Sequence, residues 1–184
     1  MSTPKKAHMK ATAGIKFGVK AHATAFHPLP DDNPCYTQIG LIAAEGARIE
    51  HLLNQSIANA AGVDQKIAAC FTGQMIGPGP RFSALLQLCT ERGLPTELLK
   101  RIKTISGHAG EMFERRNRAV HDAWLEEVGA GTSHQFLGKP KQKTDFGVKP
   151  KTEQELKNDL TEFRKHREEV IDLVSDVWKA LQPS

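Results

Sequence analysis

Several features that mark particular protein classes are missing from this sequence of 184 residues. No apolar run approaches the roughly 18 residues of a transmembrane helix, which argues against a membrane partner. Only three cysteines occur, Cys35, Cys70 and Cys89, and their odd number and unrelated spacings fit neither a disulfide framework nor a zinc site. No glycine-rich phosphate loop and no internal repeat is present. We therefore expect a cytoplasmic protein with reduced thiols, no metal and no cofactor.

Acidic residues are absent from the first 26 positions, which contain seven lysines or histidines. The apolar segment of a secretory signal does not follow Lys5 and Lys6. The stretch HPLPDDNP then interrupts the chain with three prolines. The sequence thus predicts a basic, loosely structured N-terminal arm over residues 1–35, with a short strand around 15–20, and a single helical domain over 36–184. The arm either touches RNA phosphates or is a solvated tail.

From Tyr36 onwards apolar residues recur at the three- and four-residue steps of amphipathic helices. The first helix ends at Gly62, a short helix covers residues 64–75, and a third helix ends at Gly93. A long helix then begins with Thr96 as its N-cap and continues through Trp124. The first helix has its apolar residues on one face: Ile39, Ile42, Ile49, Leu53, Ile57 and Ala60.

Two strand-like runs, HQFLG and TDFGVK, flank the basic stretch KPKQK and predict a β-hairpin at about residues 133–150. The sequence TEQE, Thr152 to Glu155, matches a capping box and begins the last helix. The predicted fold is therefore all-α, a bundle of four to five helices with a β-hairpin inserted before the last helix. A net charge of +4 permits an anionic partner without requiring one.

The stretch ERRNRAVHDAW, near the end of the long helix, contains the candidate site. At 100° per residue, Arg116 falls near the centre of an apolar stripe, whereas Arg115 and Arg118 point elsewhere. A buried, unpaired guanidinium is costly, so Arg116 needs a partner. One explanation is a carboxylate of the first helix, Glu45 or Glu50, and the other is a polar cleft shared with a second subunit. The stripe consists of Ile102, Ile105, Ala109, Met112, Phe113, Val120 and Ala123.

Arg116 is followed by the polar Asn117 and, five positions after the arginine, by His121. This pattern resembles the motif of the HEPN superfamily (higher eukaryotes and prokaryotes nucleotide-binding), which lies late in a helix of an all-α bundle. The predicted order of elements over about residues 36–181 resembles that superfamily too. The resemblance implies a metal-independent endoribonuclease that acts as a homodimer in toxin–antitoxin or defence biology, with RNA as substrate and an antitoxin or other regulatory protein as partner.

The resemblance also implies roles for individual residues. His121 would exchange protons near neutral pH, and Arg116 would stabilise charge on the phosphate. Asn117 would orient the imidazole or bind a phosphate oxygen, or would be only a polar residue at the edge of the stripe. Contacts with RNA are expected from Arg118, from Trp124 and from three lysines of the hairpin tip: Lys139, Lys141 and Lys143.

Several alternatives stay open at the level of sequence. Trp124 either stacks on a base or packs beneath the hairpin, and the lysine-rich tip either binds RNA or is simply solvated. HEPN toxins paired with nucleotidyltransferase antitoxins usually carry a tyrosine two residues after the histidine, where this chain has Ala123. Regulation by modification of that tyrosine is therefore excluded. The rival functions are a non-catalytic HEPN-like domain that binds RNA or a nucleotide, and a purely structural bundle.

Overall fold

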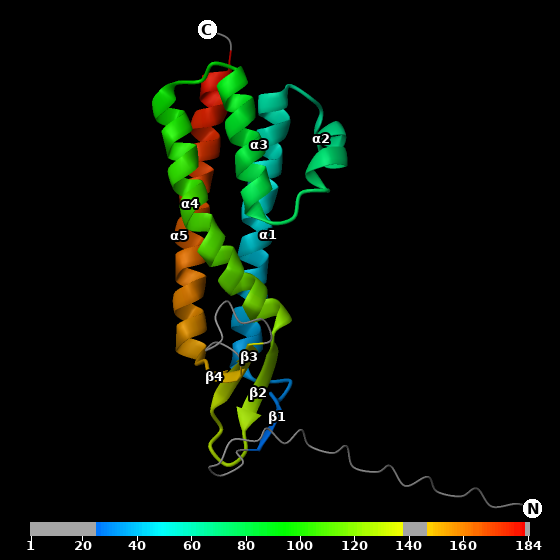
Figure 1. Ribbon diagram of the computed structural model, residues 1–184, viewed down its shortest axis with the longest axis vertical. Helices are drawn as coiled ribbons and strands as arrows, with labels where there is room; N and C mark the ends of the chain where they lie inside the picture. The colour runs from blue at the N-terminus through cyan, green and yellow to red at the C-terminus, as the bar shows by residue number, and fades with distance from the viewer. Residues whose placement is uncertain (1–24, 138–146, 183–184) are drawn as a thin grey trace, which may run out of the picture.

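The structure is a computed structural model that describes residues 25–137 and 147–182. Within these ranges, four helices form an elongated bundle, a short helix lies at its side, and a small sheet closes one end (Figure 1). The bundle helices are α1 (Pro34–Ala61), α3 (Pro78–Glu91), α4 (Thr96–His121) and α5 (Glu153–Leu181), and the short helix is α2 (Gln65–Thr72). The predicted helices are thus confirmed in number and order.

Four antiparallel strands make up the sheet, in the order β1-β2-β3-β4. They are β1 (Phe26–Pro28), β2 (Ala123–Glu127), β3 (Ser133–Leu137) and β4 (Gly147–Pro150). The predicted hairpin is confirmed, because β3 pairs with β4. The all-α class is only partly right, because β1 and β2 extend that hairpin into a sheet.

The folded domain begins earlier than the sequence predicted. β1 pairs with β2, and α1 begins at Pro34 with the Asn33 side chain accepting a hydrogen bond from the backbone N–H of Cys35. Residues 26–35 therefore belong to the fold, and the predicted boundary at residue 35 lies too late. The strand predicted at residues 15–20 and the lysines of the hairpin tip lie outside the described residues.

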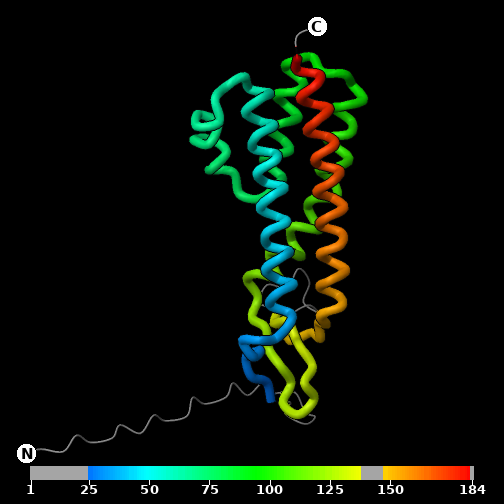
Figure 2. Tube along the Cα trace, turned by 180° about the vertical axis from the view of Figure 1, so that it is seen from behind, coloured from blue at the N-terminus to red at the C-terminus, as the bar shows by residue number. Residues whose placement is uncertain are grey.

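α1 and α5 run side by side and in the same direction along the bundle (Figure 2). Their apolar stripes supply much of the core, including Ile49 and Leu53 from α1 and Phe163 and Val170 from α5. The predicted capping box of α5 is present: Thr152 Oγ1 accepts from the N–H of Glu155, and Glu155 Oε2 accepts from the N–H of Thr152. No helix in the described ranges combines the length and apolarity needed to cross a lipid bilayer.

The ends of α4 differ from the sequence prediction. Pro95, not Thr96, occupies the N-cap position, and no side chain caps this end. At the other end the helix stops at His121, because Asp122 adopts an extended conformation (φ −78°, ψ 150°) that leads into β2. Trp124 is therefore a strand residue. Figure 1 shows α4 changing direction midway, so that its second half crosses towards α1.

Candidate functional site

Arg116 lies in the second half of α4, with its side chain against α1. A Cβ atom on Gly46 of α1 would lie only 3.4 Å from Arg116 Nε, so the glycine makes room for the guanidinium. Arg116 Nη1 donates a hydrogen bond of 2.9 Å to Asn117 Oδ1. Arg116 Nε is buried and has no hydrogen-bond partner in the described part of the chain. The guanidinium is therefore half-buried and only partly satisfied.

The two carboxylates predicted as partners of Arg116 are committed to other arginines. Glu45 forms ion pairs with Arg48, Arg164 and Arg167, and Glu50 approaches Arg81 at 4.0 Å. The prediction that Glu45 or Glu50 pairs with Arg116 is therefore wrong. Both carboxylates do lie on α1: Glu45 is about 100° around the helix from Gly46, whereas Glu50 is only about 40° from it but approaches Arg81 instead of Arg116.

The neighbouring arginines of α4 have structural partners. Arg115 Nη1 donates to Asp159 at 2.8 Å, and its Nη2 donates to Glu162, which ties α4 to α5. Arg115 is thus ion-paired and lies outside the apolar stripe. Arg118 pairs with Glu114 one turn earlier on α4, at 3.0 Å. An RNA contact by Arg118 would have to share or displace that carboxylate.

His121 is the last residue of α4 and is exposed. The following Asp122 accepts a hydrogen bond of 3.3 Å from Gln135 Nε2 of β3. Burial raises the pKa of Asp122, and the positive charges of Arg118 and His121 partly offset that rise. His121 and Arg118 are therefore close enough to act on one carboxyl group. Asn117, which bonds to Arg116, is exposed on the same last turns of the helix.

Trp124 takes the packing role that the sequence left open. Its side chain is 7% exposed and belongs to the core, and its indole N–H donates 2.9 Å to the carbonyl of Ala119. The ring is therefore covered and does not offer a face for a base, which corrects its assignment as an RNA contact. In the last turn of α4 the buried apolar residue is Ala119, which is 5% exposed, and not Val120, which is 36% exposed.

A basic cluster surrounds Glu45 and was not predicted from the sequence. Glu45 is only 2% exposed, and Arg48 from α1 and Arg164 and Arg167 from α5 converge on its carboxylate. The available signals were the position of Glu45 beside the apolar face of the first helix and the interruption of the last helix's stripe by Arg167. Neither signal identifies the pairing, because Glu45 and Arg167 are 122 residues apart.

In the described ranges, no group of three or more histidine, cysteine, aspartate or glutamate side chains is arranged to hold a metal ion. Comparisons of the chain with protein-family models, curated proteins and solved structures found no match. The residues at the end of α4 and the surfaces beside them are the features of the chain that bear on its function.

Proposed function

We propose that this protein is a HEPN-like endoribonuclease that cleaves RNA without a metal and acts as a homodimer. The observation that supports this most is the setting of Arg116. Its guanidinium is half-buried against Gly46, hydrogen-bonded to Asn117, and free of any carboxylate within ion-pair distance among the described residues. A permanent positive charge without a neutralising partner is suited to an anionic ligand.

The proposed reaction uses the ribose 2′-OH as the nucleophile. The 2′ oxygen attacks the adjacent phosphorus, the bond from phosphorus to the 5′ oxygen breaks, and the products are a 2′,3′-cyclic phosphate and a 5′-OH. One proton must leave the 2′ oxygen and one must reach the departing 5′ oxygen. An exposed imidazole such as that of His121 performs such transfers near neutral pH. The guanidinium of Arg116 stabilises the charge that builds up on the phosphate oxygens.

The homodimer follows from the spacing of the two residues. Five residues on an α-helix turn through about 140° beyond a full circle and advance about 7.5 Å. Arg116 and His121 of one α4 therefore point to different sides, and a second copy would bring His121 of one subunit towards Arg116 of the other. Light scattering tests this step: a monomer at micromolar concentration would remove the shared site.

A non-catalytic role in RNA or nucleotide binding is the second candidate. The observation that favours it is that no hydrogen bond within the described residues orients the His121 imidazole, whereas a general base is commonly fixed by a third group. A binding domain needs the positive charge of Arg116 but not a positioned imidazole. A partner of the antitoxin kind is compatible with either candidate.

The experiment is to incubate purified protein with labelled single-stranded RNA in EDTA and to analyse the products. The wild type should cleave and leave 2′,3′-cyclic phosphate ends, and His121→Ala should lower the rate about 10²-fold or more while the fold stays intact. His51→Ala removes another exposed histidine, on α1, and is the matched control. Cleavage that survives in His121→Ala would refute the assignment, and retention of RNA without cleavage by the wild type would favour the second candidate.

A further inference from the structure

Two arginines from different helices meet at one oxygen atom beside the seam between α1 and α5. Arg48 Nη1 lies 2.8 Å and Arg164 Nε 3.6 Å from Glu45 Oε1. Two guanidinium groups would repel each other at this separation, and the buried carboxylate holds them together. The arrangement is thus fixed before any ligand arrives.

Much of the hydrogen-bonding capacity of these two arginines is unused. The Arg48 and Arg164 side chains are 60% and 53% exposed, and within the described residues each directs one nitrogen to Glu45. Arg167 is different, because Glu45 and Glu168 engage its Nε, Nη1 and Nη2. Arg48 and Arg164 therefore offer outward-facing guanidinium forks, a geometry that matches the oxygens of a phosphate.

A groove begins one helical turn beyond Arg48 on α1 and two turns beyond Arg164 on α5. Leu52 follows Arg48 by four residues, and Ile171 follows Arg164 by seven residues, so both helices lead from the arginines into the groove. The groove has a volume of about 380 Å³. Trp178, one of the two tryptophans in the chain, lies at the far end of the groove, and 52% of its surface is exposed.

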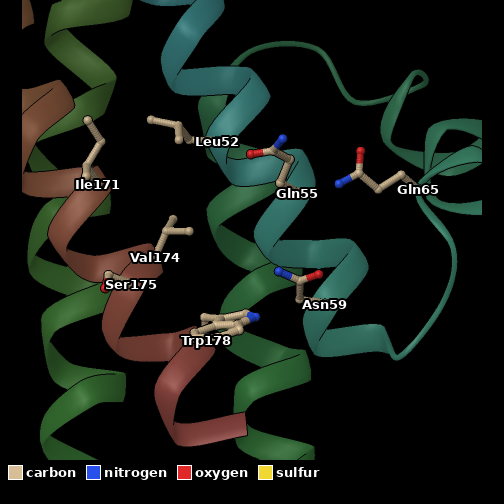
Figure 3. A pocket seen from close by; sticks show the side chains of 8 residues that line it. All are labelled: Leu52, Gln55, Asn59, Gln65, Ile171, Val174, Ser175 and Trp178. Atoms are coloured by element: carbon tan, nitrogen blue, oxygen red, sulfur yellow. The ribbon is translucent and has the colours of Figure 1, made fainter. Parts of the chain in front are cut away.

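The lining of the groove combines flat apolar surface with amide groups. Figure 3 shows the Trp178 indole extending from α5 towards α1 beside Asn59, while the Gln65 amide points from α2 towards α1 and the Gln55 amide turns towards Leu52. The apolar part consists of Leu52, Ile171 and Val174 together with the indole. A nucleobase has the complementary character, with apolar faces that stack on aromatic rings and polar edges that pair with amides.

We propose that this groove binds a base of single-stranded RNA stacked on Trp178, and that Arg48 and Arg164 bind a phosphate of the same strand. The inference takes RNA as the ligand from the proposed function but does not depend on cleavage. The fourteen residues from Arg164 to Trp178 span about 21 Å along α5, so the strand must be extended and several nucleotides long. The amides that line the groove and the exposed arginines beyond its end favour RNA over an apolar segment of a protein.

Binding is measured by fluorescence anisotropy with labelled single-stranded oligonucleotides of about 12 nucleotides, in the His121→Ala background so that no cleavage interferes. Trp178→Ala should weaken binding about tenfold, and Trp178→Phe should restore most of it because phenylalanine still stacks. Arg48→Gln with Arg164→Gln should weaken binding and lower the slope of log affinity against log salt by about one.

The matched control removes two charges elsewhere. Lys100→Gln with Lys157→Gln eliminates exposed lysines that pair within their own helices, and it should change the slope less than the arginine variant does. The single variant Arg48→Gln leaves Arg164 and Arg167 paired with Glu45, so the fold should be retained. A loss of RNA binding in this variant is then not caused by unfolding. The exposed indole of Trp178 should also lose fluorescence when RNA binds, whereas the buried Trp124 should not respond.

Three results would overturn the inference. The first is unchanged binding in both the Trp178 and the arginine variants, and the second is absence of RNA binding by the wild type. The third is a Trp178→Ala variant that changes oligomeric state in light scattering and leaves RNA binding unaltered, which would make the groove a protein interface. Cleavage that depends on His121 in a protein whose groove variants bind RNA normally would overturn this inference alone and leave the proposed function intact.

Discussion

Replacing Glu45 with glutamine tests whether the buried carboxylate holds the α1–α5 seam together. Glutamine keeps the shape of the side chain and one acceptor oxygen, but it loses the negative charge and turns an N–H₂ group towards an arginine. Two short charge-assisted hydrogen bonds are affected, from Arg48 at 2.8 Å and from Arg167 at 2.7 Å. Three guanidinium groups then converge, and within the described ranges Arg167 alone keeps a carboxylate partner, Glu168.

The size of the effect follows from these contacts. A hydrogen bond to a charged group contributes about 1.5–3 kcal/mol when its partner is buried. Glu45 is buried, but Arg48 is 60% exposed and keeps part of its hydration, so its share must be discounted. We expect Glu45→Gln to lower the free energy of unfolding by about 2–4 kcal/mol. For a domain of this size that corresponds to a fall in Tm of about 5–15 °C.

Urea unfolding followed by circular dichroism measures the change directly. Glu97→Gln is the control, because Glu97 is 83% exposed, pairs only with Lys100 in the described structure, and should leave stability unchanged. A loss for Glu45→Gln of less than about 0.5 kcal/mol, the range of ordinary surface substitutions, would show that the carboxylate does not hold the arginines. The orientation of Arg48 and Arg164 would then lack its physical basis.

Two further predictions concern titratable groups. Burial lowers the pKa of His166 below its ordinary value of 6.5, so the unfolded chain binds this proton more readily than the folded one. Stability should therefore decline as pH falls below about 6.5, and His166→Phe should decline less in urea titrations at the same pH values. Burial raises the pKa of Cys89 to about 11, so a thiol reagent at neutral pH should label the exposed Cys70 and spare Cys89 until the protein unfolds. Rapid labelling of Cys89 in the native state would contradict its packing.

The helices were predictable because their signals are local. The stripe of α1, its end at Gly62 and the capping box at Thr152 each depend on residues within a few positions of one another. Gly62 has φ +69°, the left-handed conformation that favours glycine at a helix end, and this also explains why the stop was visible in the sequence. The hairpin was predictable for a similar reason, since β3 and β4 are close in sequence.

The features that could not be predicted depend on contacts between distant segments. The end of α4 has no glycine or proline to mark it, and apolar residues continue at helical spacing through Ala123. β2 forms there because β1 and β3 supply hydrogen-bond partners on both sides. β1 contains Pro28, and proline is uncommon inside strands, so the sequence assigns this segment to the arm. Only its pairing with β2 identifies it as a strand. The partners of Glu45 are equally non-local, because two of them come from α5.

The two proposed RNA contacts, Arg116 beside Gly46 and the groove at Trp178, lie on different sides of α1. We therefore expect the first to act in cleavage and the second in binding. Gly46, which receives Arg116, is 100° around the helix from Glu45, whereas the groove residues Leu52 and Asn59 are displaced in the other direction. A strand that occupies the groove must therefore pass around α1, about 10–12 Å across, before its phosphates reach Arg116 of the same chain. On this proposal the groove holds RNA without aligning the bond that is cut. Variants of Trp178 should then raise KM and leave kcat unchanged, because the contact they remove is the same in the bound substrate and in the transition state.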